Sequence, residues 1–286
     1  MRLIDHLKTL GLSNREARAR LDSGKVWLNG VPTADPGREV DPAQVELRPQ
    51  APRVTVGRDP IILWRDAHLA VVWKPARMLS VPAPKRKESN LLVEVGRVLG
   101  TVFPVHRLDE QTSGLIMVAR SEPCQTGLKA LLEAHEVERR YLAIVDGHLS
   151  ESEQLIRSNL VRNRGDGKRG TGTGEGKLAI THIQRLRAIG PGSLVLATLQ
   201  TGRTHQVRIH LAEAGHPILG EPLYASRAIA QRSPRLALHA TVLGFDHPIT
   251  GESLRFEAPL ADDLEQLCRD LQTQRPPPKK KRRKRR

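Results

Sequence analysis

The first 50 residues carry a pattern of apolar positions that predicts two short helices and a strand. Three leucines recur at helical spacing and mark one face of the first helix, namely Leu3, Leu7 and Leu10. Ser13 followed by Glu16 forms a capping box, which predicts a second helix ending near Gly24. The run Val26–Val31 predicts a strand that ends in an Asn-Gly turn. These elements define a small module over residues 1–50.

A polar linker at residues 51–60 separates this module from a longer region of alternating segments. Short apolar runs predict strands at Ile61–Trp64, Leu69–Trp73, Gly114–Ala119, Tyr141–Val145 and Leu194–Leu199. Longer segments with helical spacing predict helices at Asn90–Leu99, Glu122–His135 and Thr204–Ala214. The mixture predicts an α+β domain built around a mixed sheet over residues 61–271. The Gly- and Arg-rich stretch 162–176 has no apolar period, so we expect a mobile loop there.

The charge of the chain favours a polyanionic partner. The net charge is +15, and removing the eight consecutive basic residues Lys279–Arg286 still leaves +7. A basic body of this kind most often binds nucleic acid. The basic run follows three prolines, so we expect a disordered basic tail over residues 272–286. Because the chain has only eight aromatic residues, RNA contact is expected to depend on phosphates and shape more than on base stacking.

Composition also argues against several other classes of protein. No run of about 18 apolar residues predicts a membrane helix, and the first residues lack the pattern of a signal peptide. Cys124 and Cys268 lie far apart, and no His, Cys and Asp set has metal-ligand spacing. We therefore expect a cytoplasmic monomer with free thiols, no bound metal, no cofactor and no membrane partner.

The segment His106–Leu115, with the sequence HRLDEQTSGL, is the richest in candidate chemistry. It lies between two apolar runs, which places a polar cluster on a connection held by strands. Reactive residues are often presented on such connections. Taken alone, Asp109 fits a turn residue better than a catalytic one, because Asp, Thr, Ser and Gly all favour turns.

Later segments change this interpretation. Residues 199–211 have the sequence LQTGRTHQVRIHL, residues 215–220 have GHPILG, and Leu238–Ala240 is a Leu-His-Ala segment. With HRLDEQTSGL, Lys74-Pro75 and the RYLA segment at 140–143, they resemble the motifs of the RluA-type pseudouridine synthase family. The resemblance extends from about residue 61 to residue 265, and the motifs follow the family's order.

The resemblance implies a role for each matching residue. It makes Asp109 the essential carboxylate, Arg208 its ionic partner and Tyr141 the ring that lies on the uracil. It places Arg107 in the space left by the flipped nucleotide. Further substrate contacts are implied in the later motif for Arg203, His205 and Val207.

The family's reaction breaks a C–N glycosidic bond, turns the uracil and forms a C–C bond, without a cofactor. An ionised carboxylate can act as nucleophile or base, and a nearby arginine favours its charged form. An aromatic face can hold the detached base, and a nucleotide in stacked RNA must first be flipped out. We expect Thr204 to cap a helix that directs Arg208 toward the catalytic loop. Glu221 stands where Asp is commoner in the family, a difference expected to matter little.

The N-terminal module carries a second resemblance. A helix, a capped basic helix, a glycine, a strand and an Asn-Gly turn resemble, in that order, the alpha-L RNA-binding module of a ribosomal protein and several RNA-modifying enzymes. It implies RNA contacts by Arg15, Arg18 and Lys25, where without the resemblance an amphipathic helix with solvated arginines would be favoured. The module makes ribosomal RNA the first expected substrate and transfer RNA the second.

Three alternatives remain open from the sequence. A non-catalytic RNA-binding or chaperone protein of the ribosome explains the charge and the module, but not Asp109. A uracil methyltransferase needs a Gly-rich cofactor turn and usually a cysteine nucleophile, whereas both cysteines lie in expected helices. A DNA-binding protein fits the charge alone.

Overall fold

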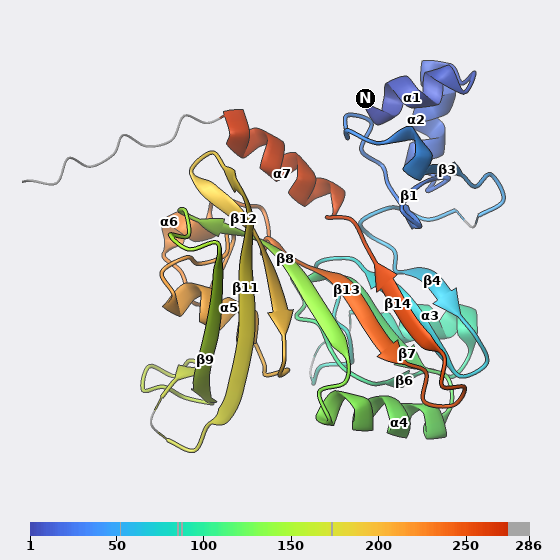
Figure 1. Ribbon diagram of the computed structural model, residues 1–286. Coiled ribbons are helices and arrows are strands. Elements are labelled where there is room, and N and C mark those ends of the chain that lie inside the picture. The colour runs from blue at the N-terminus through green and yellow to red at the C-terminus, as the bar shows by residue number, and fades with distance from the viewer. Residues whose placement is uncertain (52, 85, 87, 173, 274–286) are drawn as a thin grey trace, which may run out of the picture.

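The computed structural model describes residues 1–51, 53–84, 86, 88–172 and 174–273. It confirms the expected α+β fold: a large mixed sheet with helices packed on it, and a small sheet beside the first two helices (Figure 1). The expected basic tail lies outside the described residues from position 274 onward. Gln272 and Thr273, which we assigned to that tail, belong to the last helix. No helix in the described ranges is both long and apolar enough to cross a membrane.

The N-terminal module contains the elements expected from its pattern. They are α1 (Leu3–Thr9), α2 (Asn14–Asp22), β1 (Val26–Leu28), β2 (Val31–Pro32), the 3-10 helix η1 (Pro42–Gln44) and β3 (Val45–Leu47). The capping box is present, because Ser13 Oγ accepts from the backbone N of Glu16 and the Glu16 carboxylate accepts from the backbone N of Ser13. Leu10, expected on the buried face, is instead exposed, since α1 ends at Thr9.

The large sheet confirms the predicted strands and adds others. Its order is β10-β9-β11-β12-β8-β13-β7-β5-β4, with β14 on β13 and β6 on β7. The strands are β4 (Ile61–Arg65), β5 (Leu69–Lys74), β6 (Phe103–Pro104), β7 (Ser113–Ala119), β8 (Glu138–Asp146), β9 (Glu153–Val161), β10 (Gly170–Thr171), β11 (Lys177–Ile189), β12 (Gly192–Leu199), β13 (Leu238–Asp246) and β14 (Ser253–Glu257). The polar, largely exposed strand β9 was missed because it shows no apolar run, and it forms by pairing with β11.

Helices cover both faces of the sheet. They are α3 (Leu91–Leu99), α4 (Glu122–Glu133), α5 (Gln206–Glu213), α6 (Arg227–Ala230) and α7 (Asp262–Thr273). Alternate side chains of β5 point to opposite faces, as strand geometry requires. Val71 packs in the core that contains Leu128 of α4, whereas Val72 packs with Val95 of α3. Helices α5 and α7 share a third core with β8, β11 and β12.

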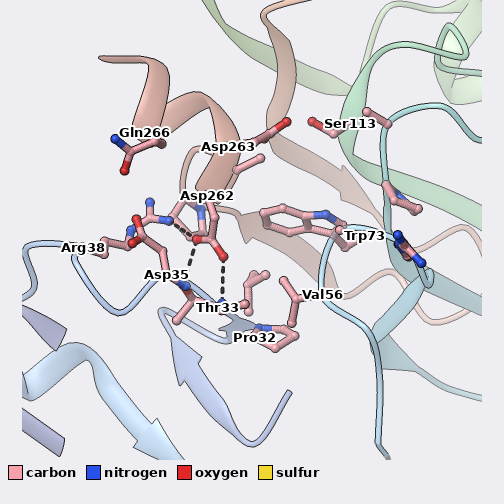
Figure 2. Close-up of a pocket in the computed structure, with 18 of the residues that line it drawn as sticks. Pro32, Thr33, Asp35, Arg38, Val56, Trp73, Ser113, Asp262, Asp263 and Gln266 are labelled. Carbon is pink, nitrogen blue, oxygen red and sulfur yellow. Dashed lines mark hydrogen bonds and ion pairs between the residues drawn. The ribbon is translucent and has the colours of Figure 1, made fainter. Parts of the chain in front are cut away.

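The N-terminal module is docked onto the domain of the large sheet through the start of α7 (Figures 1 and 2). The Asp262 carboxylate accepts from Thr33 Oγ1 at 2.7 Å and from the backbone N of Ala34 at 2.8 Å. It also accepts from Nη1 of the buried Arg38 at 2.7 Å. Trp27 of the module belongs to the same hydrophobic core as β5 and β7. A cavity of about 520 Å³ remains at this interface, and Asp109 is not among its lining residues.

Candidate active site

The loop between β6 and β7 presents Asp109 and is held from two sides. Ser80 Oγ accepts from the backbone N of Leu108 at 3.0 Å and donates to the Leu108 carbonyl at 2.8 Å. The fully buried Lys74 donates from Nζ to the carbonyl of Glu110 at 3.3 Å. Burial lowers the pKa of Lys74 to about 7. The residues on either side of Asp109 are therefore anchored, whereas 20% of the Asp109 side chain stays exposed.

The end of this loop enters the sheet where β7 pairs with β13 in parallel. Gly114 has φ +114°, and a Cβ there would overlap the backbone of Ala240. The glycine of the catalytic motif is thus required by the close approach of two strands. Next to it, Ser113 Oγ lies 2.8 Å from Nδ1 of the buried His239, whose pKa burial lowers to about 3. The Leu-His-Ala segment on β13 therefore supports the loop that presents Asp109.

Helix α5 begins in a way that the sequence did not predict. Thr204 is not the cap; the helix starts after His205, which has a left-handed φ of 60° and no side-chain capping bond. The side chain of Gln206 organises the turn, since its Oε1 accepts from the backbone N of Arg203 at 3.0 Å and from Thr201 Oγ1 at 2.8 Å. The turn makes Arg208 the third residue of the helix, and its side chain is buried.

The Arg208 guanidinium joins two carboxylates. Its Nη1 donates to Asp109 Oδ2 at 2.9 Å, while Nε and Nη2 donate to the two oxygens of Glu221 at 2.7 and 2.8 Å. Burial alone would lower the pKa of Arg208, but the bonds to Glu221 and Asp109 raise it above its ordinary value. Arg208 therefore remains a permanent cation beside the candidate catalytic carboxylate.

A cavity of about 310 Å³ brings together seven residues singled out from the sequence. They are Arg107, Asp109, Tyr141, Arg203, His205, Val207 and Arg208. The half-buried Tyr141 extends from β8, and burial raises its pKa to about 12, so its hydroxyl keeps its proton at neutral pH. Apolar side chains beside it complete one wall, whereas the exposed Arg107 lies on the catalytic loop.

His205 occupies the other side of the carboxylate. Its Nε2 lies 3.6 Å from Asp109 Oδ1, and its Nδ1 lies 2.8 Å from the hydroxyl of Tyr224. Burial lowers the pKa of His205, which favours the neutral imidazole. The Tyr224 hydroxyl thus holds a neutral His205 ring beside the carboxylate, where the ring does not compete with Arg208 for the charge of Asp109.

The three residues expected to bind RNA through the module lie outside this cavity. Arg15 and Arg18 are exposed, whereas Lys25 donates from Nζ to the carbonyl of Ala51. The module therefore exposes the two arginines, whereas its lysine already has a partner at the linker.

Sequence reasoning missed the supporting residues of the site. Glu221, which the sequence interpretation noted only as a replacement for the commoner Asp, is fully buried and holds Arg208, and its Oε1 also accepts from the backbone N of Leu223 at 2.8 Å. Arg139 on β8 lines the cavity, but the sequence interpretation did not include it. The signal available in the sequence was only their closeness to the motif residues Tyr141 and Gly220. Among the described residues, no group of three or more His, Cys, Asp and Glu could hold a metal ion.

The fold and the pocket together define an enzyme site for a nucleotide within a nucleic acid. A carboxylate and a tyrosine ring in a small pocket suit a flat, uncharged base, and the basic residues beside them suit a phosphate backbone.

Comparison with known proteins specifies this class. The family model for RNA pseudouridylate synthase matches residues 68–213. The chain is 38% identical to ribosomal large subunit pseudouridine synthase D of Zymomonas mobilis, over 72% of this chain and 71% of that protein. It is 36% identical to the dual-specificity RNA pseudouridine synthase RluA of Escherichia coli, over 70% of this chain and 92% of that protein.

A solved structure agrees with these relatives. The human RNA pseudouridylate synthase domain containing 1 superposes with a TM-score of 0.62 and 25% identity, over 79% of this chain and 99% of that chain. The chain therefore belongs to the RNA pseudouridine synthase family, as the resemblance in its motifs implied. Its reaction is the isomerisation of uridine to pseudouridine in RNA, and a non-catalytic RNA-binding role is not favoured.

Proposed function

We propose that this pseudouridine synthase modifies uridines of ribosomal RNA, with Asp109 as the essential carboxylate. The relative from Zymomonas mobilis is named for the large ribosomal subunit, which supports ribosomal RNA as the substrate. The Escherichia coli relative is named as having dual specificity, so transfer RNA is the second candidate. The exposed Arg15 and Arg18 of the module supply positive charge for contacts with structured RNA.

The observation that carries the proposal is the geometry at Asp109. Its Oδ2 accepts from Arg208 at 2.9 Å, which favours the ionised carboxylate. Its side chain still opens into the cavity, on the wall of which Tyr141 lies. An ionised, partly exposed oxygen facing an aromatic ring can act on a uracil or its sugar while the ring holds the base.

The remaining site residues have supporting roles in this proposal. Tyr141 and Val207 form the surface on which the uracil rests while it turns. Arg107 is exposed on the catalytic loop and enters the space that the flipped nucleotide leaves in the RNA stack. Arg203 and His205 contact the substrate from the turn before α5.

The proposal is tested by mapping pseudouridine chemically in RNA treated with the purified enzyme. The substrates are unmodified ribosomal RNA and unmodified transfer RNA, each with wild-type enzyme, Asp109→Asn and the control Asp246→Asn. Asp246 is an exposed carboxylate at the end of β13, so its substitution should change nothing. We expect new pseudouridine in ribosomal RNA with wild type and the control only. Modification confined to transfer RNA would reject the substrate, and product from Asp109→Asn above about one part in a thousand would reject the essential carboxylate.

We further place the enzyme in the cytoplasm as a monomer. Ribosomal RNA is present in that compartment, and the two buried free cysteines are stable there as thiols. Sedimentation of the purified chain and of its complex with RNA tests the monomeric state.

A further inference from the structure

Arg139 is a second buried arginine of the active-site cavity, and it lacks the partners that Arg208 has. Only 8% of Arg139 is exposed, and neither its Nε nor its Nη2 has a hydrogen-bond partner among the described residues. Arg208, with 6% exposed, binds two carboxylates. Two buried guanidinium nitrogens without hydrogen-bond partners are unfavourable, so an acceptor from outside the chain would stabilise Arg139 in this position.

The glycine of the TGRTH motif makes room for this guanidinium. Gly202 does not have a positive φ, so its backbone conformation does not require glycine. A Cβ at Gly202 would instead overlap Nη1 of Arg139. The motif glycine therefore leaves room for the Arg139 guanidinium at the wall of the cavity.

The guanidinium lies where two cavities share a wall. The active-site cavity and a second one of about 300 Å³ are both lined by His106, Arg139, Gly202 and Arg203. Burial and the charge of Arg139 lower the pKa of His106 to about 3, so this imidazole is neutral near pH 7. A group entering at the shared wall thus meets two guanidiniums and a neutral ring, which favours an anion.

Strand spacing relates this anion to the base. Arg139 and Tyr141 are two residues apart on β8, so their side chains point to the same face, about 7 Å apart along the strand. This separation is similar to that between a nucleobase and the phosphates of its own nucleotide. We propose that Arg139 binds the phosphodiester adjoining the target uridine while the base lies against Tyr141. The proposal rests on the proposed role of Tyr141, and it names the RNA backbone, not the detached uracil, as the partner of Arg139.

The test measures RNA binding in an Asp109→Asn background, where turnover does not interfere. The probe is the RNA stem-loop around the uridine that the wild-type enzyme modifies, with either normal phosphodiesters or one neutral methylphosphonate next to that uridine. Arg139→Gln should weaken binding of the normal RNA by about tenfold to a hundredfold, as expected for a charged hydrogen-bonding pair. In the RNA that carries the methylphosphonate at the linkage contacted by Arg139, Arg139→Gln should cause no further loss of affinity.

The matched control is Arg140→Gln, which removes the same charge from the opposite face of β8, where Arg140 pairs with Glu138 at 2.5 Å. It should leave the effect of the methylphosphonate unchanged. If Arg139→Gln does not fold, the proposal is tested with the unsubstituted Arg139 and a series of RNAs, each neutralised at a different linkage. Only the linkage next to the uridine should then give the loss of affinity. Equal losses at every linkage, or an Arg139→Gln variant that binds the normal RNA as tightly as its Asp109→Asn parent, would overturn the proposal. Because the stem-loop is chosen by where modification occurs, a transfer RNA target would reject the ribosomal assignment without affecting this test.

Discussion

The fully buried Glu221 accepts hydrogen bonds from the Arg208 guanidinium with both carboxylate oxygens, at 2.7 and 2.8 Å. The remaining hydrogen bond of Arg208 goes to Asp109. Glu221 therefore positions Asp109, the carboxylate that we consider catalytic, through the guanidinium that lies between them. Removing the charge of Glu221 should therefore affect catalysis without any direct contact with substrate.

We predict that Glu221→Gln lowers kcat by about a hundredfold and leaves RNA affinity nearly unchanged. The amide replaces one accepting oxygen with a donor that faces a guanidinium N–H, so Arg208 shifts, and small displacements of catalytic groups carry losses of this size. Single-turnover kinetics with RNA-binding titrations measure the two quantities. The control Glu252→Gln alters an exposed carboxylate and should behave as wild type. Unchanged kcat in Glu221→Gln would show that Asp109 does not depend on this support.

We predict that Gly114→Ala destabilises the protein by more than about 3 kcal/mol, because strands β7 and β13 would have to separate. Gly251→Ala is the matched control. Gly251 also has a positive φ, of 74°, but a Cβ there meets nothing within 4 Å, so only the backbone strain of about 1 kcal/mol remains. Urea unfolding of both variants gives the difference, and equal losses would mean that conformation, not strand contact, requires the glycine.

We predict that His239 makes the protein less stable as the pH falls below about 6.5. Burial holds the pKa of His239 at about 3, whereas the unfolded chain has an ordinary histidine. Between these values the unfolded state binds the extra proton, so the free energy of unfolding decreases by up to about 1.4 kcal/mol per pH unit. His239→Asn should remove this contribution to the slope between pH 6.5 and 4.5, whereas substitution of the exposed His148 by Asn should keep it. Identical slopes in wild type and His239→Asn would contradict the neutral buried ring.

We predict that Asp262→Ala loosens the N-terminal module from the catalytic domain. The substitution removes three accepted hydrogen bonds and leaves the buried Arg38 without this partner, a change that costs about 3 kcal/mol. Proteolysis in the linker at residues 51–60 should become faster. KM for RNA should rise while kcat at saturation stays within about twofold, because lost ground-state contacts affect binding alone. Asp270→Ala, on an exposed position of the same helix, is the control. A large fall in kcat would place the module within the catalytic machinery.

The local sequence determined the elements and the candidate chemistry. The capping box at Ser13 and Glu16 depends on residues three apart, so it formed as predicted. The apolar runs of β5 and β7 predicted buried strands correctly, because the residues of each strand are themselves apolar and become buried. The motifs around Asp109 and Arg208 identified the family and the seven residues that line one cavity.

Only the tertiary structure decided which partners these residues have. Strand β9 is polar and forms because β11 pairs with it, and no pattern within nine residues encodes that pairing. Glu221 received no role from the sequence, and the fold buries it against Arg208, thirteen residues away. Arg139 remained unnoticed because an arginine two residues before a tyrosine does not by itself indicate a buried side chain. Its lack of a partner appears only when the described parts of the chain surround it, since hydrogen bonds and counter-ions are set by distances in space and not along the sequence.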